Sequence, residues 1–266
     1  WGVAADRDGE LFVEKHVGKI SGVNTGIFAD KPCSLAIGHT RWATHGGVTD
    51  VNAHPHFSSD KTVAVVHNGI IENYEMIRDE LGRENFISET DTEVIPQLIA
   101  HYRKTMDFPE AVLTAVRRLK GRYSIVAINV GSHQLVAARR GSPLIVGVGK
   151  KEYFLASDIP AFLEHTQDVM YLDDNEMVIL NHEVTFLSIE TGKKIKKRLV
   201  NIDWKAESAE RGEYDHFMLK EIMEQNETIL RAIDQNDDDI ERISCTVRIK
   251  NTGIILRGFD ITRKTD

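Results

Sequence analysis

The order of strand-like and helix-like segments constrains the fold of this chain more than any other feature of the sequence. Short apolar or alternating segments come first, three helical patterns follow, and strand-like segments return over residues 122–200. Strands and helices do not alternate regularly, which argues against a parallel sheet with crossover helices. The pattern predicts an α+β sandwich in which antiparallel sheets and helices form separate layers.

The individual elements follow from periodicity and from the turn residues between them. Strands are expected at residues 1–5, 11–15, 35–38, 62–66, 123–128, 134–139, 144–148, 153–156, 176–180 and 184–189. Helices are expected at residues 70–81, from about 90 to 99, and from 107 to 120. Asp107 and Pro109 mark the start of the third helix, and Thr90 and Glu93 have the spacing of a capping box for the second.

Three segments are expected along the 266 residues. Residues 1–212 form the main domain, residues 213–239 a linker helix that ends in an acidic run, and residues 240–266 a tail or the start of a further, truncated domain. Trp1 and the residues after it have the pattern of the middle of a strand, so the chain is expected to begin inside an element.

Charge and composition argue against several classes of function. The chain has 33 Lys and Arg against 41 Asp and Glu, a net charge of −8, so the basic face of a nucleic-acid-binding protein is not expected. No apolar run approaches the ~20 residues that span a bilayer, so no membrane contact is expected. Two cysteines are too few for a disulfide scaffold, which favours a cytoplasmic location.

Histidines are dense in one region, since five of the eleven lie between residues 39 and 67. Imidazole is a common zinc ligand, so a metal site has to be weighed. The spacing does not fit one: His54 and His56 form only a bare H-x-H pair, and neither cysteine belongs to a paired motif. Neither a metal nor another cofactor is therefore expected.

Polar groups in the same region suit a small zwitterion better than a metal. Arg41 offers a fork of donors for a carboxylate, and Asp91 offers a carboxylate for an ammonium group. Asn68 and Gly69 can place an amide and a backbone N–H side by side, as an oxyanion hole requires. Each also has a structural alternative: a surface ion pair for Arg41, a helix start for Asp91, and a hairpin turn for Asn68-Gly69.

Several blocks of sequence carry a family resemblance. The four main blocks are His39-Thr40-Arg41-Trp42-Ala43-Thr44-His45-Gly46, Asn52-Ala53-His54-Pro55-His56, His67-Asn68-Gly69-Ile70-Ile71-Glu72-Asn73-Tyr74 and Ser88-Glu89-Thr90-Asp91-Thr92-Glu93-Val94-Ile95. Supporting blocks are Ala138-Arg139-Arg140-Gly141-Ser142-Pro143-Leu144, Ala156-Ser157-Asp158 and His216-Phe217-Met218-Leu219-Lys220-Glu221-Ile222. In this order they strongly resemble the glutaminase half of the glutamine–fructose-6-phosphate aminotransferases, over about residues 1–230.

The resemblance implies both a fold and an activity. The fold would be an N-terminal-nucleophile-type four-layer αββα sandwich of antiparallel sheets, here lacking its first strand and helix. The activity would be hydrolysis of glutamine to glutamate and ammonia, with ammonia transferred to fructose 6-phosphate in a sugar-isomerase half that residues 1–266 do not contain. Partners implied for the full-length enzyme are glutamine, fructose 6-phosphate and a second copy of the chain.

The resemblance also implies which residues bind glutamine. Arg41 would hold the α-carboxylate and Asp91 the α-amino group of the substrate. Thr44, His45 and Gly69 would line the pocket around it.

Catalytic roles are implied for two residues and a gating role for a third. Asn68 and Gly69 would form the oxyanion hole, and Trp42 would gate the passage of ammonia between the two halves.

The nucleophile of the family is an N-terminal cysteine whose own α-amino group acts as the base. Residue 1 of this chain is Trp1, and Cys33 has no terminal amine beside it. These residues alone are therefore expected to be inactive. Two alternatives stay open: a non-catalytic module that binds glutamine or a partner chain, and a glutaminase of the amidophosphoribosyltransferase type, which shares this layout.

Overall fold

The computed structural model describes residues 1–7, 9–20, 33–203, 219–220, 222–225 and 229. The chain divides into a first unit, Trp1–Ala206, and a second unit, Glu207–Asp266. Nearly all described residues belong to the first unit, which holds every strand and helix named below. The expected linker helix and the segment 240–266 lie largely outside the described residues, so the three predicted domain segments remain a prediction.

A seven-stranded antiparallel sheet forms the centre of the first unit, in the order β13-β12-β11-β7-β6-β5-β4. Its strands are β4 (His56–Phe57), β5 (Val63–Ile71), β6 (Gly121–Asn129), β7 (Leu135–Arg140), β11 (Glu176–Leu180), β12 (Val184–Ser188) and β13 (Lys194–Ile195). The first five residues of β5 are all buried, as are most residues of β6. Both faces of β5 and β6 pack against other layers, which is why their sequences are continuous runs of apolar, β-branched residues.

Two smaller antiparallel sheets complete the β-structure, in the orders β2-β1-β3 and β14-β10-β8-β9. The first contains β1 (Gly2–Arg7), β2 (Glu10–Lys15) and β3 (Leu35–His39). The second contains β8 (Ile145–Val148), β9 (Tyr153–Ala156), β10 (Asp168–Tyr171) and β14 (Val200–Asn201). The two strands predicted first in the chain pair with each other, from Gly2↔Lys15 to Arg7↔Glu10.

Three α-helices lie between β5 and β6 in the sequence: α1 (Tyr74–Leu81), α2 (Val94–Arg103) and α3 (Phe108–Arg118). Two short 3₁₀ turns, η2 (Arg83–Asn85) and η3 (Ile159–Ala161), follow α1 and β9. The start of α3 is as predicted: the Asp107 side chain accepts a hydrogen bond from the Glu110 amide at 2.9 Å, and Pro109 lies in the first turn.

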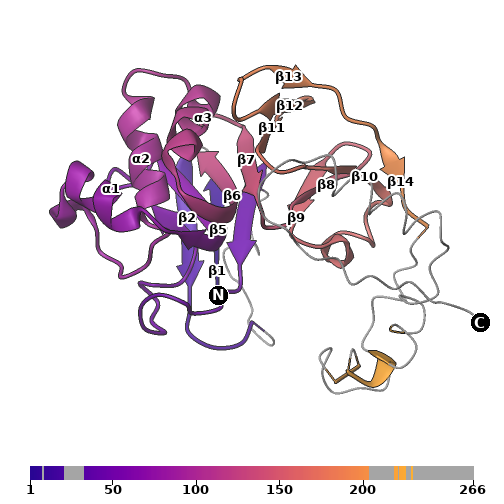
Figure 1. Cartoon of the computed structure of the whole chain (residues 1–266), viewed down its shortest axis with the longest axis horizontal. Helices are drawn as coiled ribbons and strands as arrows, with labels where there is room; N and C mark the ends of the chain where they lie inside the picture. The colour runs from indigo at the N-terminus through magenta and orange to yellow at the C-terminus, as the bar shows by residue number, and fades with distance from the viewer. Residues whose placement is uncertain (8, 21–32, 204–218, 221, 226–228, 230–266) are drawn as a thin grey trace, which may run out of the picture. The chain divides into compact units, whose positions relative to one another are not determined.

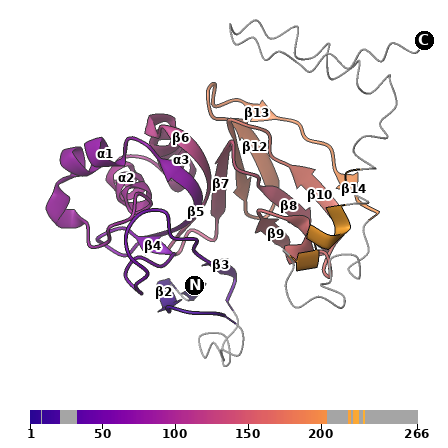
Figure 2. The same ribbon diagram turned by 60° about the horizontal axis from the view of Figure 1, so that its bottom comes forward.

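The layers are visible in both ribbon views, where the helices lie on one side of β5–β7 and strands β8–β10 on the other (Figures 1 and 2). The helices share one apolar core with the large sheet, including Ile95, Leu98 and Val116 against Val65 and Ile125. The opposite face of that sheet packs on the two smaller sheets through separate clusters. The antiparallel α+β architecture predicted from the sequence is confirmed.

Two predicted boundaries next to the site are wrong. The strand predicted to end at Val66 continues to Ile71, and the helix predicted to begin at Ile70 begins at Tyr74. In the added part of β5, Asn68 pairs with Ser124 and Gly69 with Tyr123 of β6. The hairpin-turn alternative for Asn68-Gly69 is therefore wrong. A nine-residue ladder with β6 outweighs the local turn preference of an Asn-Gly pair.

The expected capping box at Thr90 and Glu93 is also wrong. Glu93 occupies the N-cap position of α2 without making a side-chain cap bond. Its carboxylate instead accepts hydrogen bonds from the Ile87 amide at 3.0 Å and the Ser88 amide at 2.7 Å, which are upstream of the helix. No helix among the described residues is long and apolar enough to cross a membrane.

Candidate functional site

A cavity of about 340 Å³ lies where β3, β5 and two loops meet. It is lined by His39, Thr40, Arg41, Trp42, Thr44, His54, His67, Asn68, Gly69, Ile70, Thr90, Asp91 and Thr92. Six of the seven residues expected in the site are in this lining, although they come from three separate stretches of sequence. The seventh, His45, is not among the lining residues.

Arg41 is half-buried and holds the loop that follows it. Its guanidinium donates to the carbonyl of Gly47 at 2.9 Å and of Gly46 at 3.4 Å, and also to the carbonyl of His45. Burial lowers the pKa of Arg41, while Asp91 and the neighbouring Glu89 oppose that shift. An arginine has five N–H donors, so these three acceptors leave capacity for a ligand carboxylate.

The same loop is tied to the segment that carries Asp91. The Asn52 amide donates to Glu89 at 2.9 Å and to the Gly47 carbonyl at 3.0 Å, and the Gly47 amide donates to Glu89 at 3.0 Å. The Glu89 amide in turn donates to the Asn52 side-chain oxygen at 3.0 Å. These bonds lower the pKa of Glu89, so it stays charged near neutral pH. The loop is therefore positioned by a specific network rather than by chain length alone.

Asp91 is buried at the cavity wall. One carboxylate oxygen accepts the Ile71 amide at 2.7 Å, which joins Asp91 to the end of β5. Arg78 of α1 fixes the backbone just before it, donating to the carbonyls of Ser88 at 2.8 Å and Thr90 at 2.7 Å. Asp91 therefore presents a negative charge to the cavity from a segment that is braced on both sides.

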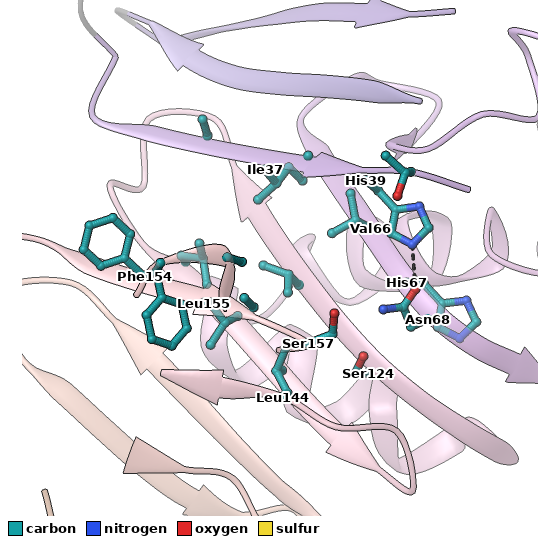
Figure 3. A pocket seen from close by; sticks show the side chains of 18 of the residues that line it. Ile37, His39, Val66, His67, Asn68, Ser124, Leu144, Phe154, Leu155 and Ser157 are labelled. Atoms are coloured by element: carbon teal, nitrogen blue, oxygen red, sulfur yellow. Dashed lines mark hydrogen bonds between the residues drawn. The ribbon is translucent and has the colours of Figure 1, made fainter. Parts of the chain in front are cut away.

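Asn68 lies on β5 with its side chain toward β3. Its side-chain oxygen is 2.7 Å from His39 Nε2, a contact drawn in Figure 3. Asn68 and His39 also line a second cavity of about 460 Å³, shown in Figure 3, which extends toward Ser124, Phe154 and Ser157. Asn68 is thus shared by two adjoining cavities.

Glycine is required at position 69. Its φ is +133°, a conformation that side-chain-bearing residues rarely adopt, and a Cβ there would lie 2.0 Å from the Arg122 carbonyl oxygen. Gly69 allows β5 to pass close to β6 at the point where the cavity wall forms.

Buried histidines adjoin the site. The His67 amide donates to His54 Nδ1 at 3.2 Å, and the Thr92 hydroxyl lies 2.9 Å from His67 Nδ1 and 3.4 Å from His54 Nε2. Burial lowers the pKa of His67 to about 4 and that of His54 and His56 well below its usual value. These side chains are therefore neutral at pH 7.

The other predicted residues have more exposed positions. Trp42 is 84% exposed, and Thr44 is exposed beside it. His45 packs edge-on against Tyr74 of α1, with ring centroids 5.8 Å apart. Cys33 is a free, half-exposed cysteine and lines neither cavity described above.

Three residues that position the site were not predicted from the sequence: His39, Arg78 and Glu89. Arg78 acts on backbone carbonyls, so local spacing carried no signal for it. His39 stands in the same sequence block as Arg41, and Glu89 in the same block as Asp91, and this was a signal that both belong to the site. Among the described residues, no group of three or more His, Cys, Asp or Glu side chains is placed to hold a metal ion.

Comparison with known proteins identifies the family. Residues 39–164 match the family model of a glutamine amidotransferase domain. A glutamine–fructose-6-phosphate aminotransferase of Methanothermobacter thermautotrophicus is 48% identical over 239 residues, which cover 88% of this chain and 40% of that protein. One of the same name from Clostridium tetani is 52% identical over 198 residues, 73% of this chain and 32% of that protein.

Solved structures extend the comparison to the fold. The glutamine phosphoribosylpyrophosphate amidotransferase of B. subtilis has a TM-score of 0.61 at 24% identity, over 71% of this chain and 43% of that one. A second structure, described as the allosteric regulatory enzyme of purine biosynthesis, has a TM-score of 0.59 at 26% identity, over the same shares of the two chains.

Family model, curated relatives and fold together define the class: the chain is a glutamine amidotransferase domain of the N-terminal-nucleophile type. Sequence similarity to the curated relatives then identifies the family within this class. The chain belongs with the glutaminase part of the glutamine–fructose-6-phosphate aminotransferases, and it spans about two fifths of the length of the first curated relatives it matches.

Proposed function

We propose that this domain binds glutamine in the cavity between β3 and β5, hydrolyses it to glutamate and ammonia, and supplies the ammonia to an acceptor sugar. The observation that carries the proposal is the convergence of Arg41, Asn68, Gly69 and Asp91 on one cavity of about 340 Å³. These residues come from separate parts of the chain, and their chemistry matches the charged groups and the reacting amide of one amino acid.

Binding of the amino-acid end rests on opposite charges. Arg41 would pair with the α-carboxylate through its remaining N–H donors, and Asp91 would pair with the α-ammonium through the carboxylate oxygen not bonded to Ile71. Thr44 and Gly69 would line the cavity around the side chain, and His45 would support that wall from its contact with Tyr74.

Hydrolysis requires stabilisation of a negatively charged oxygen on the side-chain amide carbon of glutamine. Asn68 and Gly69 line the cavity together and can provide that stabilisation, because the Asn68 side-chain NH₂ and the Gly69 backbone N–H are both hydrogen-bond donors. The strand position of both residues supports this role, because a strand fixes donors more precisely than a turn does.

The nucleophile in the family is a cysteine with a free α-amino group, which no described residue of this chain provides at the cavity. We therefore expect purified residues 1–266 to bind glutamine but to release no ammonia from it. Turnover by this chain that is lost in Cys33→Ala would contradict this expectation and make Cys33 the nucleophile. The alternative of a non-catalytic glutamine-binding module predicts the same inactivity, so activity has to be tested in a longer protein.

The acceptor and the assembly are taken from the relatives. Proteins named glutamine–fructose-6-phosphate aminotransferase support fructose 6-phosphate as acceptor, and exposed Trp42 at the cavity supports a gating role for ammonia. Assembly as a homodimer and a cytoplasmic location are part of the same proposal. The amidophosphoribosyltransferase alternative has weaker support, because its similarity at 24% identity concerns the fold alone.

A chimera tests the proposal directly. Residues of this chain would replace the matching 256-residue segment of the Clostridium perfringens relative, which supplies everything outside that segment. We expect the chimera to release ammonia from glutamine, and Asn68→Ala to lower kcat by about 10²–10³ with little change in KM. A folded chimera without glutaminase activity, or an Asn68→Ala variant with full kcat, would contradict the proposal.

A further inference from the structure

The contact between His39 and Asn68 joins two strands of different sheets at the edge of the cavity. His39 is the last residue of β3, Asn68 lies in β5, and the two are 29 positions apart in the sequence. The distance of 2.7 Å between His39 Nε2 and the Asn68 side-chain oxygen is that of a short hydrogen bond (Figure 3). Because an amide oxygen can only accept, His39 Nε2 carries the proton.

This contact decides which way the Asn68 amide faces. The amide group is planar, so holding its oxygen at His39 directs its NH₂ group away from His39 and leaves that group for another acceptor. If the amide were reversed, the NH₂ group would be used at His39 and an oxygen would face the developing negative charge. The orientation of the Asn68 amide therefore determines whether this side chain stabilises or destabilises an oxyanion.

We propose that His39 is a positioning residue for glutamine hydrolysis, which holds the Asn68 side chain so that its NH₂ group donates to the oxyanion. This inference rests on the proposed function but adds a residue and an action to it. His39 acts through Asn68 and is not itself assigned a contact with the substrate.

The surroundings of His39 keep it in this role. Its ring stacks on His54, with centroids 4.3 Å apart and planes 19° apart, which fixes the plane of the imidazole. Its Nδ1 atom is buried and has no hydrogen-bond partner among the described residues, so no acceptor there favours a proton on Nδ1 over Nε2. Burial lowers the pKa of His39, with Arg41 acting in the same direction and the bond to Asn68 opposing it. The ring is therefore neutral at pH 7, with its proton on Nε2.

Nuclear magnetic resonance of the chain itself gives a first test that needs no activity. Nitrogen chemical shifts of ¹⁵N-labelled His39 distinguish the Nε2–H from the Nδ1–H tautomer, and His39→Phe identifies the signal. We expect the Nε2–H form at pH 7. The Nδ1–H form would mean that Asn68 donates to His39, which would overturn the proposal.

Kinetics of the chimera give the second test. His39→Phe keeps an aromatic ring to stack on His54 but has no donor, whereas His39→Gln keeps an amide donor. We expect His39→Phe to lower kcat by about tenfold to a hundredfold, less than loss of the Asn68 donor itself, with KM for glutamine nearly unchanged. His39→Gln should recover most of kcat. Equal loss in both variants, or loss only in KM, would contradict a positioning role.

A double-mutant cycle separates this inference from the proposed function. If His39 acts through Asn68, adding His39→Phe to Asn68→Ala should slow the reaction no further. Additive losses would show that His39 acts by another route. An Asn68→Ala variant with full kcat would instead refute the proposed function, while a slow Asn68→Ala beside a fully active His39→Phe would refute the positioning role alone.

Discussion

Stability at mildly acidic pH should report on the buried histidines beside the cavity. His67 is fully buried, and its pKa falls from 6.5 to about 4 on folding because burial disfavours the charged ring. The unfolded chain therefore takes up a proton below about pH 6.5 that the folded chain refuses until about pH 4. The folded state loses stability as the pH falls through this window, and the loss stops below the folded pKa.

The magnitude follows from the two pKa values. Between about pH 7.5 and pH 5.0, an unfolded-state histidine of pKa 6.5 becomes almost fully protonated while His67 stays neutral, which costs about 2 kcal/mol of unfolding free energy. His54 and His56 shift in the same direction and add to the loss. Most carboxylates remain ionised at about pH 5.0, so the window isolates the histidines.

Urea unfolding of the chain at both pH values, followed by circular dichroism, measures the effect. We expect wild type to lose at least about 2 kcal/mol on acidification. His67→Gln, which keeps a polar side chain near Thr92 but cannot titrate, should lose about 2 kcal/mol less than wild type over the same interval. Equal pH dependence in the two proteins would show that His67 does not stay neutral in the folded state and would refute the reasoning.

Two further predictions distinguish a residue that binds glutamine, Arg41, from one that stabilises the fold, Arg78. Arg41→Ala in the chimera should raise KM for glutamine more than it lowers kcat, because a charge-assisted contact of about 1.5–3 kcal/mol serves ground and transition states alike; steady-state kinetics with an unchanged KM and a collapsed kcat would remove Arg41 from the binding role. Arg78→Ala should lower the unfolding free energy of the chain by about 2–4 kcal/mol, because two charge-assisted bonds to the carbonyls of Ser88 and Thr90 are lost. In the same urea assay, Arg83→Ala should change little, since its ion pairs with Glu75 and Asp79 are on the surface; equal effects of the two substitutions would contradict the bracing role of Arg78.

The fold could be predicted from the sequence where its signal is local and repeated. Helix α3 has an apolar stripe, a capping Asp107 and a proline in its first turn, and these agree with one another. Strand β10 (Asp168–Tyr171) and the two-residue strands β4, β13 and β14 were missed, since such short segments have little periodicity. The end of β5 was placed too early because Asn68-Gly69 is a local turn signal, whereas the ladder with Gly121–Asn129 comes from residues far along the chain.

The sequence predicted the residue types that line the candidate site, but not the residues that hold those segments in position. Arg41 and Asp91 are recognisable because a zwitterion needs both charges, and family resemblance placed them together. Glu93 has capping-box spacing, yet its carboxylate serves the backbone of residues 87 and 88. Arg78 bonds to main-chain carbonyls, which leave no trace in side-chain patterns. Contacts of this kind depend on which segments pack against each other, so they could not be predicted from sequence patterns.

The contacts around the cavity divide the site into a part that sets the affinity for glutamine and a part that sets the rate of hydrolysis. Arg41 donates to three loop carbonyls and keeps N–H donors for a ligand carboxylate, so its position depends on the loop at residues 45–47. Asn68 is positioned by His39, which binds its oxygen and leaves its NH₂ group for a new acceptor. Changes in the loop network of Asn52 and Glu89 should therefore act mainly on glutamine affinity, whereas changes at the β3–β5 contact should act mainly on the rate of hydrolysis.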